Sequence, residues 1–115
     1  MQNTLQDKPK KKSDRELIQL LSEKITQGDY VFLKHAKQRL KDRNISDLEV
    51  LDILQGKSGR MRKRNKMKDK YEKGHQDWNY CIEGINLDGI KIRIIFSFNE
   101  NLMPIITVIR LSRGD

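Results

Sequence analysis

The sequence has little of several features that define common protein classes. It contains one cysteine, Cys81, so no disulfide can form within the chain and a reducing compartment is the simplest expectation. Its apolar stretches are only a handful of residues long, whereas a membrane-spanning helix needs roughly 20. Residues 1–16 are almost wholly polar, unlike a secretory signal peptide. We therefore expect a cytoplasmic protein.

Familiar catalytic motifs are also lacking. The single cysteine and the two histidines have neither HExxH nor CxxC spacing, so we expect no metal site and no cofactor. The stretch Gly56-Lys57-Ser58-Gly59 has neither the spacing of a phosphate-binding P-loop nor a strand before it. No nucleophile elbow supports a serine hydrolase. Metal-dependent and P-loop chemistry are therefore not expected.

What the sequence does have is positive charge. The 115 residues fit one domain and carry a formal net charge of +8. The segment Gly56–Gly74 holds nine Lys/Arg against two Asp/Glu, a local charge of +7. Such a run is often only a solvated loop, but here the two signs are not mixed, which favours binding to a polyanion such as RNA. We expect phosphate contacts from this segment and from one nearby strand, at Arg60, Arg62, Lys63, Arg64, Lys66, Lys68 and Lys91.

The N-terminal part of the chain predicts a tail followed by a helix. Residues 1–12 contain a lysine run and almost nothing apolar, which is typical of a disordered basic tail. Ser13 and Glu16 have the spacing of a capping box, and apolar residues recur with helical spacing after them. Gly28 suits a left-handed helix end. We predict a helix over residues 14–27.

Two more helices are predicted before the basic segment. Residues 33–43 form the second, with Leu33, Ala36 and Leu40 on its inner face. A second capping box at residues 46–49 begins the third, which Gly56 ends. Its apolar edge is predicted at Leu48, Leu51 and Leu54, beside Val50 and Ile53.

The last forty residues predict an antiparallel β-meander. Its strands are expected at residues 78–87, 90–98 and 102–111. Asp88-Gly89 is a strong signal for a two-residue hairpin turn. The fold class is thus α+β, with N-terminal helices packed on a C-terminal antiparallel β-meander. The basic segment adds either an edge strand or a loop, because the alternation of its cations is too weak to decide.

A two-residue turn at Asp88-Gly89 also predicts which side chains share a face. Leu87 would lie opposite Ile90, which places Cys81 on the core face and Tyr80 on the outer face with Lys91 and Arg93. A three-residue loop at residues 99–101 would bring Thr107 beside Arg93 on that outer face.

These positions supply the residue types for RNA cleavage by its own 2′-hydroxyl. The reaction needs a proton acceptor, cations for the charged phosphorane and an acid for the leaving oxygen. His35 and Arg39 lie one helical turn apart, Arg93 lies in the sheet, and Tyr80 can stack on a base or donate a proton. Plain alternatives remain: a solvated His35, an Arg39 paired with an acid, and a Tyr80 that only packs.

Two stretches together resemble a widespread family of small bacterial domains of unknown function. They are Lys34-His35-Ala36-Lys37-Gln38-Arg39-Leu40 with Arg43-Asn44-Ile45-Ser46, and the final Ile105-Ile106-Thr107-Val108-Ile109-Arg110. That family looks related to RelE/HigB/BrnT/MqsR-type toxins of type II toxin–antitoxin systems. The resemblance covers roughly residues 32–111. Residues 57–74 are a longer basic insertion than is usual, and Ile109 stands where an aromatic residue is frequent.

The resemblance implies a RelE-like fold over residues 13–115, an mRNA-interferase type of ribonuclease activity and a neutralising antitoxin partner. Matched by position, His35 and Arg39 become catalytic candidates, with Arg93 and Tyr80 added from the predicted sheet face. The primary hypothesis is a metal-independent endoribonuclease toxin. Two alternatives use the same basic surface: a non-catalytic RNA- or ribosome-binding module, and an interaction protein that docks an acidic partner.

Overall fold

Three helices and a five-stranded sheet make up the part of the chain that a computed structural model describes, residues 8–56 and 62–111. The α+β class predicted from the sequence is confirmed. The elements in chain order are α1 (Asp14–Gln27), β1 (Tyr30–Phe32), α2 (Lys34–Arg43), α3 (Asp47–Gln55), β2 (Arg62–Arg64), the 3-10 helix η2 (Lys66–Lys68), β3 (Tyr80–Ile85), β4 (Lys91–Phe96) and β5 (Met103–Arg110).

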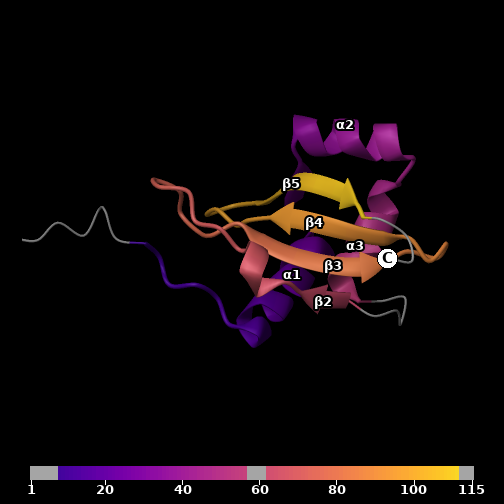
Figure 1. Cartoon of the computed structure of the whole chain (residues 1–115). Helices are drawn as coiled ribbons and strands as arrows, with labels where there is room; N and C mark the ends of the chain where they lie inside the picture. Colours follow the sequence, from indigo (N-terminus) through magenta and orange to yellow (C-terminus); the bar gives the residue numbers. More distant parts are fainter. Residues whose placement is uncertain (1–7, 57–61, 112–115) are drawn as a thin grey trace, which may run out of the picture.

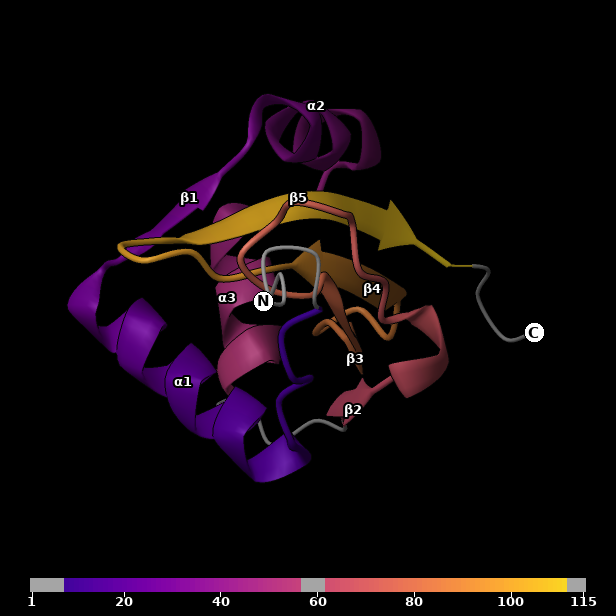
Figure 2. The ribbon, with the colours of Figure 1, turned by 90° about the vertical axis from the view of Figure 1, so that its left-hand side faces the viewer.

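The sheet has the strand order β1-β5-β4-β3-β2. The predicted meander of β3, β4 and β5 is present and antiparallel, and β2 pairs with β3 in the same way. β1, which was not predicted as a strand, pairs with β5 in parallel, so the sheet is mixed. In Figure 1, α1 and α3 lie behind the sheet while α2 lies separately along β5. Figure 2 shows the same arrangement with the sheet seen more nearly edge-on.

The helix ends follow the capping signals in the sequence. The Ser13 hydroxyl accepts from the Glu16 amide and the Glu16 carboxylate accepts from the Ser13 amide, a complete capping box. The Ser46 hydroxyl likewise accepts from the amide of Glu49 at the start of α3. Asn44 ends α2 in the left-handed region, at φ 54°. All three predicted helices are confirmed to within one residue.

The first hairpin has a different register from the predicted one. Asn86 accepts at its side-chain Oδ1 from the amides of Asp88 and Ile90, and its own amide donates to the carbonyl of Ile90. This closes a three-residue loop, so Tyr80 lies opposite Phe96. A shift of one residue turns a strand over. Tyr80 therefore points into the core, and the prediction that it lies on the outer face is wrong.

The second hairpin shifts the partner of Thr107 without changing its face. The Asn99 amide donates to the carbonyl of Leu102, which leaves a two-residue loop. A further shift between Ile95 and Phe96 places Thr107 opposite Ile95. The predicted position of Thr107 beside Arg93 is therefore wrong, but both side chains stay on the outer face. That face is the side of the sheet away from α1 and α3.

The core lies between the sheet and the layer of α1 and α3. Tyr80, Ile82, Ile92, Ile94 and Phe96 are buried there against apolar residues of both helices. Gly84 allows the close approach of α3, because a Cβ at this position would overlap Cγ2 of Ile53. Two predicted inner positions are wrong, since Leu33 is 40% and Leu48 is 68% exposed. Leu51 and Leu54 are buried as predicted, together with Val50 and Ile53.

Part of the predicted tail is attached to the domain. Pro9 accepts at its carbonyl from the Trp78 indole Nε1–H at 2.9 Å, and the Lys12 amide donates to the Tyr80 hydroxyl at 3.2 Å. The Lys12 ammonium lies 3.0 Å from Asp77, and that of Lys11 lies 4.6 Å from the centroid of the Trp78 ring. Residues 8–12 thus belong to the folded domain, which contradicts the expectation of a disordered tail there. Residues 1–7, to which the same expectation applied, lie outside the described part.

We expect removal of residues 1–12 to lower the free energy of unfolding by about 1–3 kcal/mol, because the buried Asp77 and the Trp78 indole would each lose a partner. Urea titration followed by Trp78 fluorescence measures the change. Lys10→Gln is the control, because Lys10 is exposed and surface substitutions usually stay within about 0.5 kcal/mol. Equal stability of the shortened and full-length chains would show that these contacts contribute nothing.

Candidate nucleic-acid interface

The outer face of the sheet carries a charged cluster around Glu83. The carboxylate of Glu83 accepts from Arg93 Nε at 2.8 Å and from Asn65 Nδ2 at 3.0 Å, and the Lys91 ammonium lies 3.6 Å away. Burial raises the pKa of Glu83, but the hydrogen bonds from Asn65 and Arg93 and the charges of Arg93 and Lys91 outweigh burial and hold it below its ordinary value. Glu83 therefore stays ionised and neutralises part of the charge of Arg93 and Lys91.

Two arginines of the basic segment take part in the fold. Arg62 donates from its guanidinium to the carbonyl of Leu54, at the end of α3. Arg64 lies 2.8 Å from Asp14 and 2.9 Å from Asp69, and its side chain is only 6% exposed. Both arginines were predicted to contact phosphate. Because the protein itself engages their guanidinium groups, they are not available for that role. β2 is thus an edge strand whose arginines point toward the protein.

The lysines that the structure describes in this segment are exposed. Lys63 and Lys68 are exposed, and Lys66 is exposed but lies 3.3 Å from Asp14. The hydrogen bond from Arg64, aided by this contact with Lys66, lowers the pKa of Asp14. Arg60, also predicted to bind RNA, lies outside the described residues. Within the described part of the basic segment, three cations, Arg62, Arg64 and Lys66, therefore already contact protein groups.

Tyr80 lies on the core side of the sheet, apart from Arg93. Its ring is fully buried and its hydroxyl donates to Asp77 at 2.6 Å. Burial, with the hydrogen bond to Asp77, raises the pKa of Tyr80 well above its ordinary value. The guanidinium carbon of Arg64 lies 5.3 Å from the centre of the ring. Tyr80 is placed to hold the fold together, and it offers neither a stacking face nor a proton to a ligand on the outer face.

Cys81 is buried in spite of pointing to the outer side of β3. Asp69 accepts from its amide at 3.1 Å, which anchors the segment after η2 over this position. Burial, aided by the charge of Glu83, raises the pKa of the Cys81 thiol to about 11. A thiol held in this state is a poor nucleophile. We therefore assign no chemistry to Cys81.

α2 carries a dense group of cations on one short helix. Between Lys34 and Arg43 it has five Lys/Arg and one acid, Asp42, which accepts from Gln38. Among the residues that the structure describes, none of these five cations forms an ion pair. The five are Lys34, Lys37, Arg39, Lys41 and Arg43. Ala36 is buried on the inner side of the helix, so the cations occupy its remaining surface.

His35 and Arg39 meet on α2 as their spacing predicts. Arg39 Nε donates to His35 Nε2 at 3.4 Å, and His35 is exposed. In the described part of the chain, no hydrogen bond or ion pair joins these two residues to the cluster of Glu83, Lys91 and Arg93. The four catalytic candidates thus separate into a pair on α2, Arg93 in the sheet, and Tyr80 in the core.

The described residues hold no group of three His, Cys, Asp or Glu side chains arranged to bind a metal ion. None of the described helices is both long enough and apolar enough to cross a membrane. The features left to describe the candidate interface are its exposed cations, the His35–Arg39 pair on α2 and the charged cluster on the outer face of the sheet.

The buried acids Asp69 and Asp77 were not predicted as important positions. The signal available in the sequence was the position of each acid near lysines in the chain: Asp69 between Lys68 and Lys70, and Asp77 four residues after Lys73. A lone carboxylate in such surroundings favours an ion pair within the fold. This pairing is what withdraws Arg64, Lys11 and Lys12 from the surface charge.

The fold and this surface define a small α+β protein with a basic external helix. The chain belongs to a family described as "Domain of unknown function (DUF4258)", whose model matches residues 32–110. That match begins at the end of β1 and includes α2 and the whole meander, while α1 lies before it. Neither the curated proteins nor the solved structures contain a match.

Proposed function

We propose that this protein binds RNA, with α2 as the main phosphate-binding element and the outward lysines of the basic segment as a second contact. The observation that carries the proposal is the number of cations without an ion pair on the single helix α2. Arg62 and Arg64 of the segment are engaged by the protein, whereas the five cations of α2 form no ion pair within the described residues. Unpaired cations on one helix surface favour a polyanion.

A triple substitution on α2, Lys37→Gln, Lys41→Gln and Arg43→Gln, tests this proposal. All three side chains are exposed. For single-stranded RNA each lost phosphate contact reduces the slope of log K against log salt by roughly 0.7, so we expect a reduction of about 2 and at least tenfold weaker binding at low salt. Fluorescence anisotropy of a labelled RNA, measured over a salt series, gives both quantities.

The matched control removes the same charge outside both proposed contacts, with Lys10→Gln, Arg15→Gln and Arg110→Gln, which are also exposed. We expect this control to change the slope by less than half as much. If both triple variants weaken binding equally, α2 is not the binding element. If the RNA affinity of the wild type does not depend on salt, the result favours the alternative of an interaction protein that docks an acidic partner.

A second candidate function is metal-independent endoribonuclease activity, and the pair on α2 favours it. Because Arg39 donates to His35 Nε2, that nitrogen carries a lone pair and its proton resides on Nδ1. When Arg39 turns from Nε2 to the phosphate, the freed lone pair of the neutral imidazole can take the proton of a ribose 2′-hydroxyl. The neighbouring guanidinium can stabilise the charged phosphorane. The test is cleavage of RNA by the pure protein in the presence of a chelator.

The toxin hypothesis adds partners to this activity. An antitoxin that neutralises the protein would need to cover the cations of α2, which an acidic segment can do. Binding to the ribosome would use the same helix, because ribosomal RNA offers a dense array of phosphates. We propose a cytoplasmic location for both partners. The test is co-expression with the product of a small neighbouring reading frame. The proposal predicts that the two proteins are recovered as a complex and that RNA no longer binds to it.

A further inference from the structure

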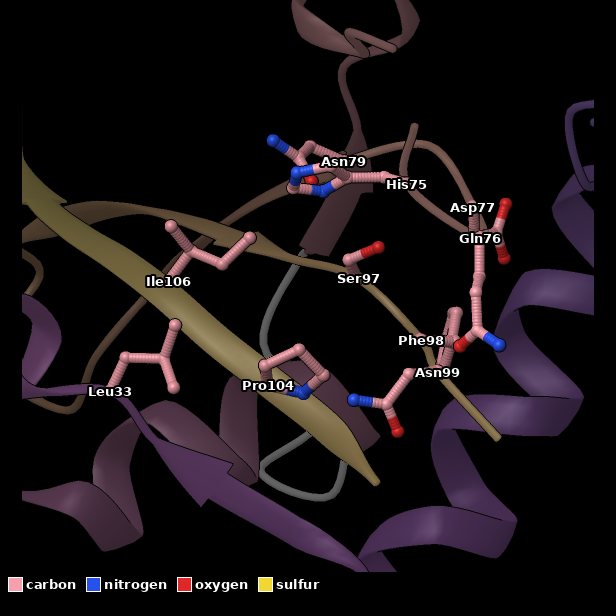
Figure 3. Close-up of a pocket in the computed structure, with 10 residues that line it drawn as sticks. All are labelled: Leu33, His75, Gln76, Asp77, Asn79, Ser97, Phe98, Asn99, Pro104 and Ile106. Atoms are coloured by element: carbon pink, nitrogen blue, oxygen red, sulfur yellow. The ribbon is translucent and has the colours of Figure 1, made fainter. Parts of the chain in front are cut away.

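Two cavities next to the sheet differ in the charge of their linings. One, of about 320 Å³, lies beside the start of α2 and has apolar walls that include Leu33 and Ile106 (Figure 3). None of its described lining residues is a lysine or an arginine. The other, of about 170 Å³, is lined by Lys63 of β2, Glu83 of β3 and Lys91 of β4. Pockets for drug-sized ligands measure about 300–1,000 Å³, so the second cavity suits only a small group.

The charged residues around this second cavity share one face of the sheet. Lys63 lies opposite Glu83 in the pairing of β2 with β3, and Glu83 lies opposite Arg93 in the pairing of β3 with β4. Residues that lie directly opposite each other project to the same face. Lys91 precedes Arg93 by two residues on β4, so it projects to that face as well. The outer face of the sheet therefore carries three cations around one carboxylate.

Glu83 holds Arg93 by one nitrogen and leaves the other two free. Arg93 Nε donates to Glu83 at 2.8 Å, and within the described part of the chain the terminal nitrogens of Arg93 donate to no protein group. Its side chain keeps 22% of its surface exposed. A guanidinium fixed in this way can offer forked hydrogen bonds to the oxygens of a phosphate. Lys63 is exposed and the side chain of Lys91 is 52% exposed, so both ammonium groups are available to the same ligand.

The charge of the cluster favours a phosphate monoester over a phosphodiester. The three cations and Glu83 leave a net charge of +2. Arg62, which also lines the cavity, adds to this charge, although the carbonyl of Leu54 engages its guanidinium. A phosphate monoester carries about −1.5 to −2 charges at pH 7 and three strong acceptor oxygens. Each phosphodiester within a strand carries only one charge.

We propose that this cluster binds a terminal phosphate monoester of the bound RNA, with Arg93 as the forked donor and Lys63 and Lys91 as the neutralising charges. The inference rests on the proposed RNA binding and adds to it a preference for a phosphorylated end. The internal phosphates of the same strand are left to α2, because no hydrogen bond or ion pair in the described residues joins that helix to this cluster.

The test compares one RNA hexamer in three forms: with a 5′-phosphate, with a 3′-phosphate, and with hydroxyl groups at both ends. Each form competes with a labelled RNA in fluorescence anisotropy. We expect the wild type to bind at least one phosphorylated form about tenfold more tightly than the hydroxyl form, since hydrogen bonds to a charged group contribute a factor of this order. The form that is preferred identifies which end of the RNA enters the site.

Two variants of the cluster should reduce this preference. Arg93→Lys keeps the charge but loses the forked donor, so most of the preference should disappear. Lys91→Gln removes one charge from the cavity lining and should reduce the preference at least threefold. Lys10→Gln is the matched control, because it removes one exposed charge outside the described lining of the cavity and should leave the preference unchanged.

The α2 triple variant separates this inference from the proposed function, because it should weaken all three hexamers alike and keep the preference. Equal affinity of the wild type for the three forms overturns the terminal-phosphate site and leaves RNA binding standing, even if calorimetry shows that inorganic phosphate binds. A preference that persists in both cluster variants also overturns it, because the preference then reports only the total charge of the RNA. If Arg93→Lys does not fold, Lys91→Gln decides alone. If no hexamer binds in low salt, both proposals fail.

Discussion

Replacing Arg64 with methionine is expected to lower the free energy of unfolding by about 3–5 kcal/mol, the range for breaking a buried ion pair from one side. The guanidinium is almost completely enclosed and lies 2.9 Å from Asp69, whose side chain is 0% exposed. Without it, the partners left to the Asp69 carboxylate within residues 8–56 and 62–111 are the amide of Cys81 and the more distant ammonium of Lys11, at 3.7 Å. Methionine preserves much of the packing against Tyr80, so the loss reports the stranded carboxylate. Equilibrium urea unfolding measures it.

Lys63→Met is the matched control, because Lys63 is the neighbouring residue of the same strand and is exposed. Its effect should stay within about 0.5 kcal/mol. A second change, Asp69→Asn in the Arg64→Met background, should recover part of the loss by removing the unpaired charge. Equal effects of Arg64→Met and Lys63→Met, or no recovery in the double variant, would contradict the structural role given to Arg64.

Local signals predicted the elements of this fold well. The capping boxes at Ser13 and Ser46 and the left-handed ends at Gly28 and Asn44 act within a few residues, so the sequence alone shows them. β1 could not be recognised this way, because three residues give no periodicity and its partner β5 lies about seventy residues further on. Parallel pairing over such a distance is a property of the whole fold.

The error in the sheet register shows where sequence reasoning stops. Asp88-Gly89 is a good turn signal, but the side chain of Asn86 organises a loop one residue longer by accepting two backbone hydrogen bonds. Because side chains alternate along a strand, that single residue moved Tyr80 from the predicted outer face into the core. β4 kept its predicted faces, so Arg93 is on the outer side as expected.

The charge of the basic segment was predicted from the sequence, but its availability was not. Whether an arginine is free depends on acids that approach it in space, here Asp14 from α1 and Asp69 from the same segment. The pairing of His35 with Arg39 followed from helical spacing alone.

If the protein is a ribonuclease, His35→Ala should lower the rate of cleavage at saturating RNA by about 10²–10⁴-fold, the usual contribution of a general base. In the step proposed, His35 Nε2 takes the proton of a 2′-hydroxyl, and the freed oxygen attacks the adjacent phosphorus. The bond from phosphorus to the 5′-oxygen then breaks, and that oxygen takes a proton from solvent. The products are a 2′,3′-cyclic phosphate and a 5′-hydroxyl, which end-labelled RNA on a sequencing gel distinguishes from the products of other nucleases.

The control on the same helix is Gln38→Ala. Gln38 is exposed and, among the residues that the structure describes, its side chain bonds only to Asp42, so cleavage should be almost unchanged. Imidazole added to His35→Ala should restore part of the rate, which a merely structural role of the histidine would not allow. RNA affinity should stay near the wild-type value, since a neutral imidazole contributes little to phosphate binding. Retained cleavage in His35→Ala, or none in the wild type, would leave α2 as a binding helix without catalytic chemistry.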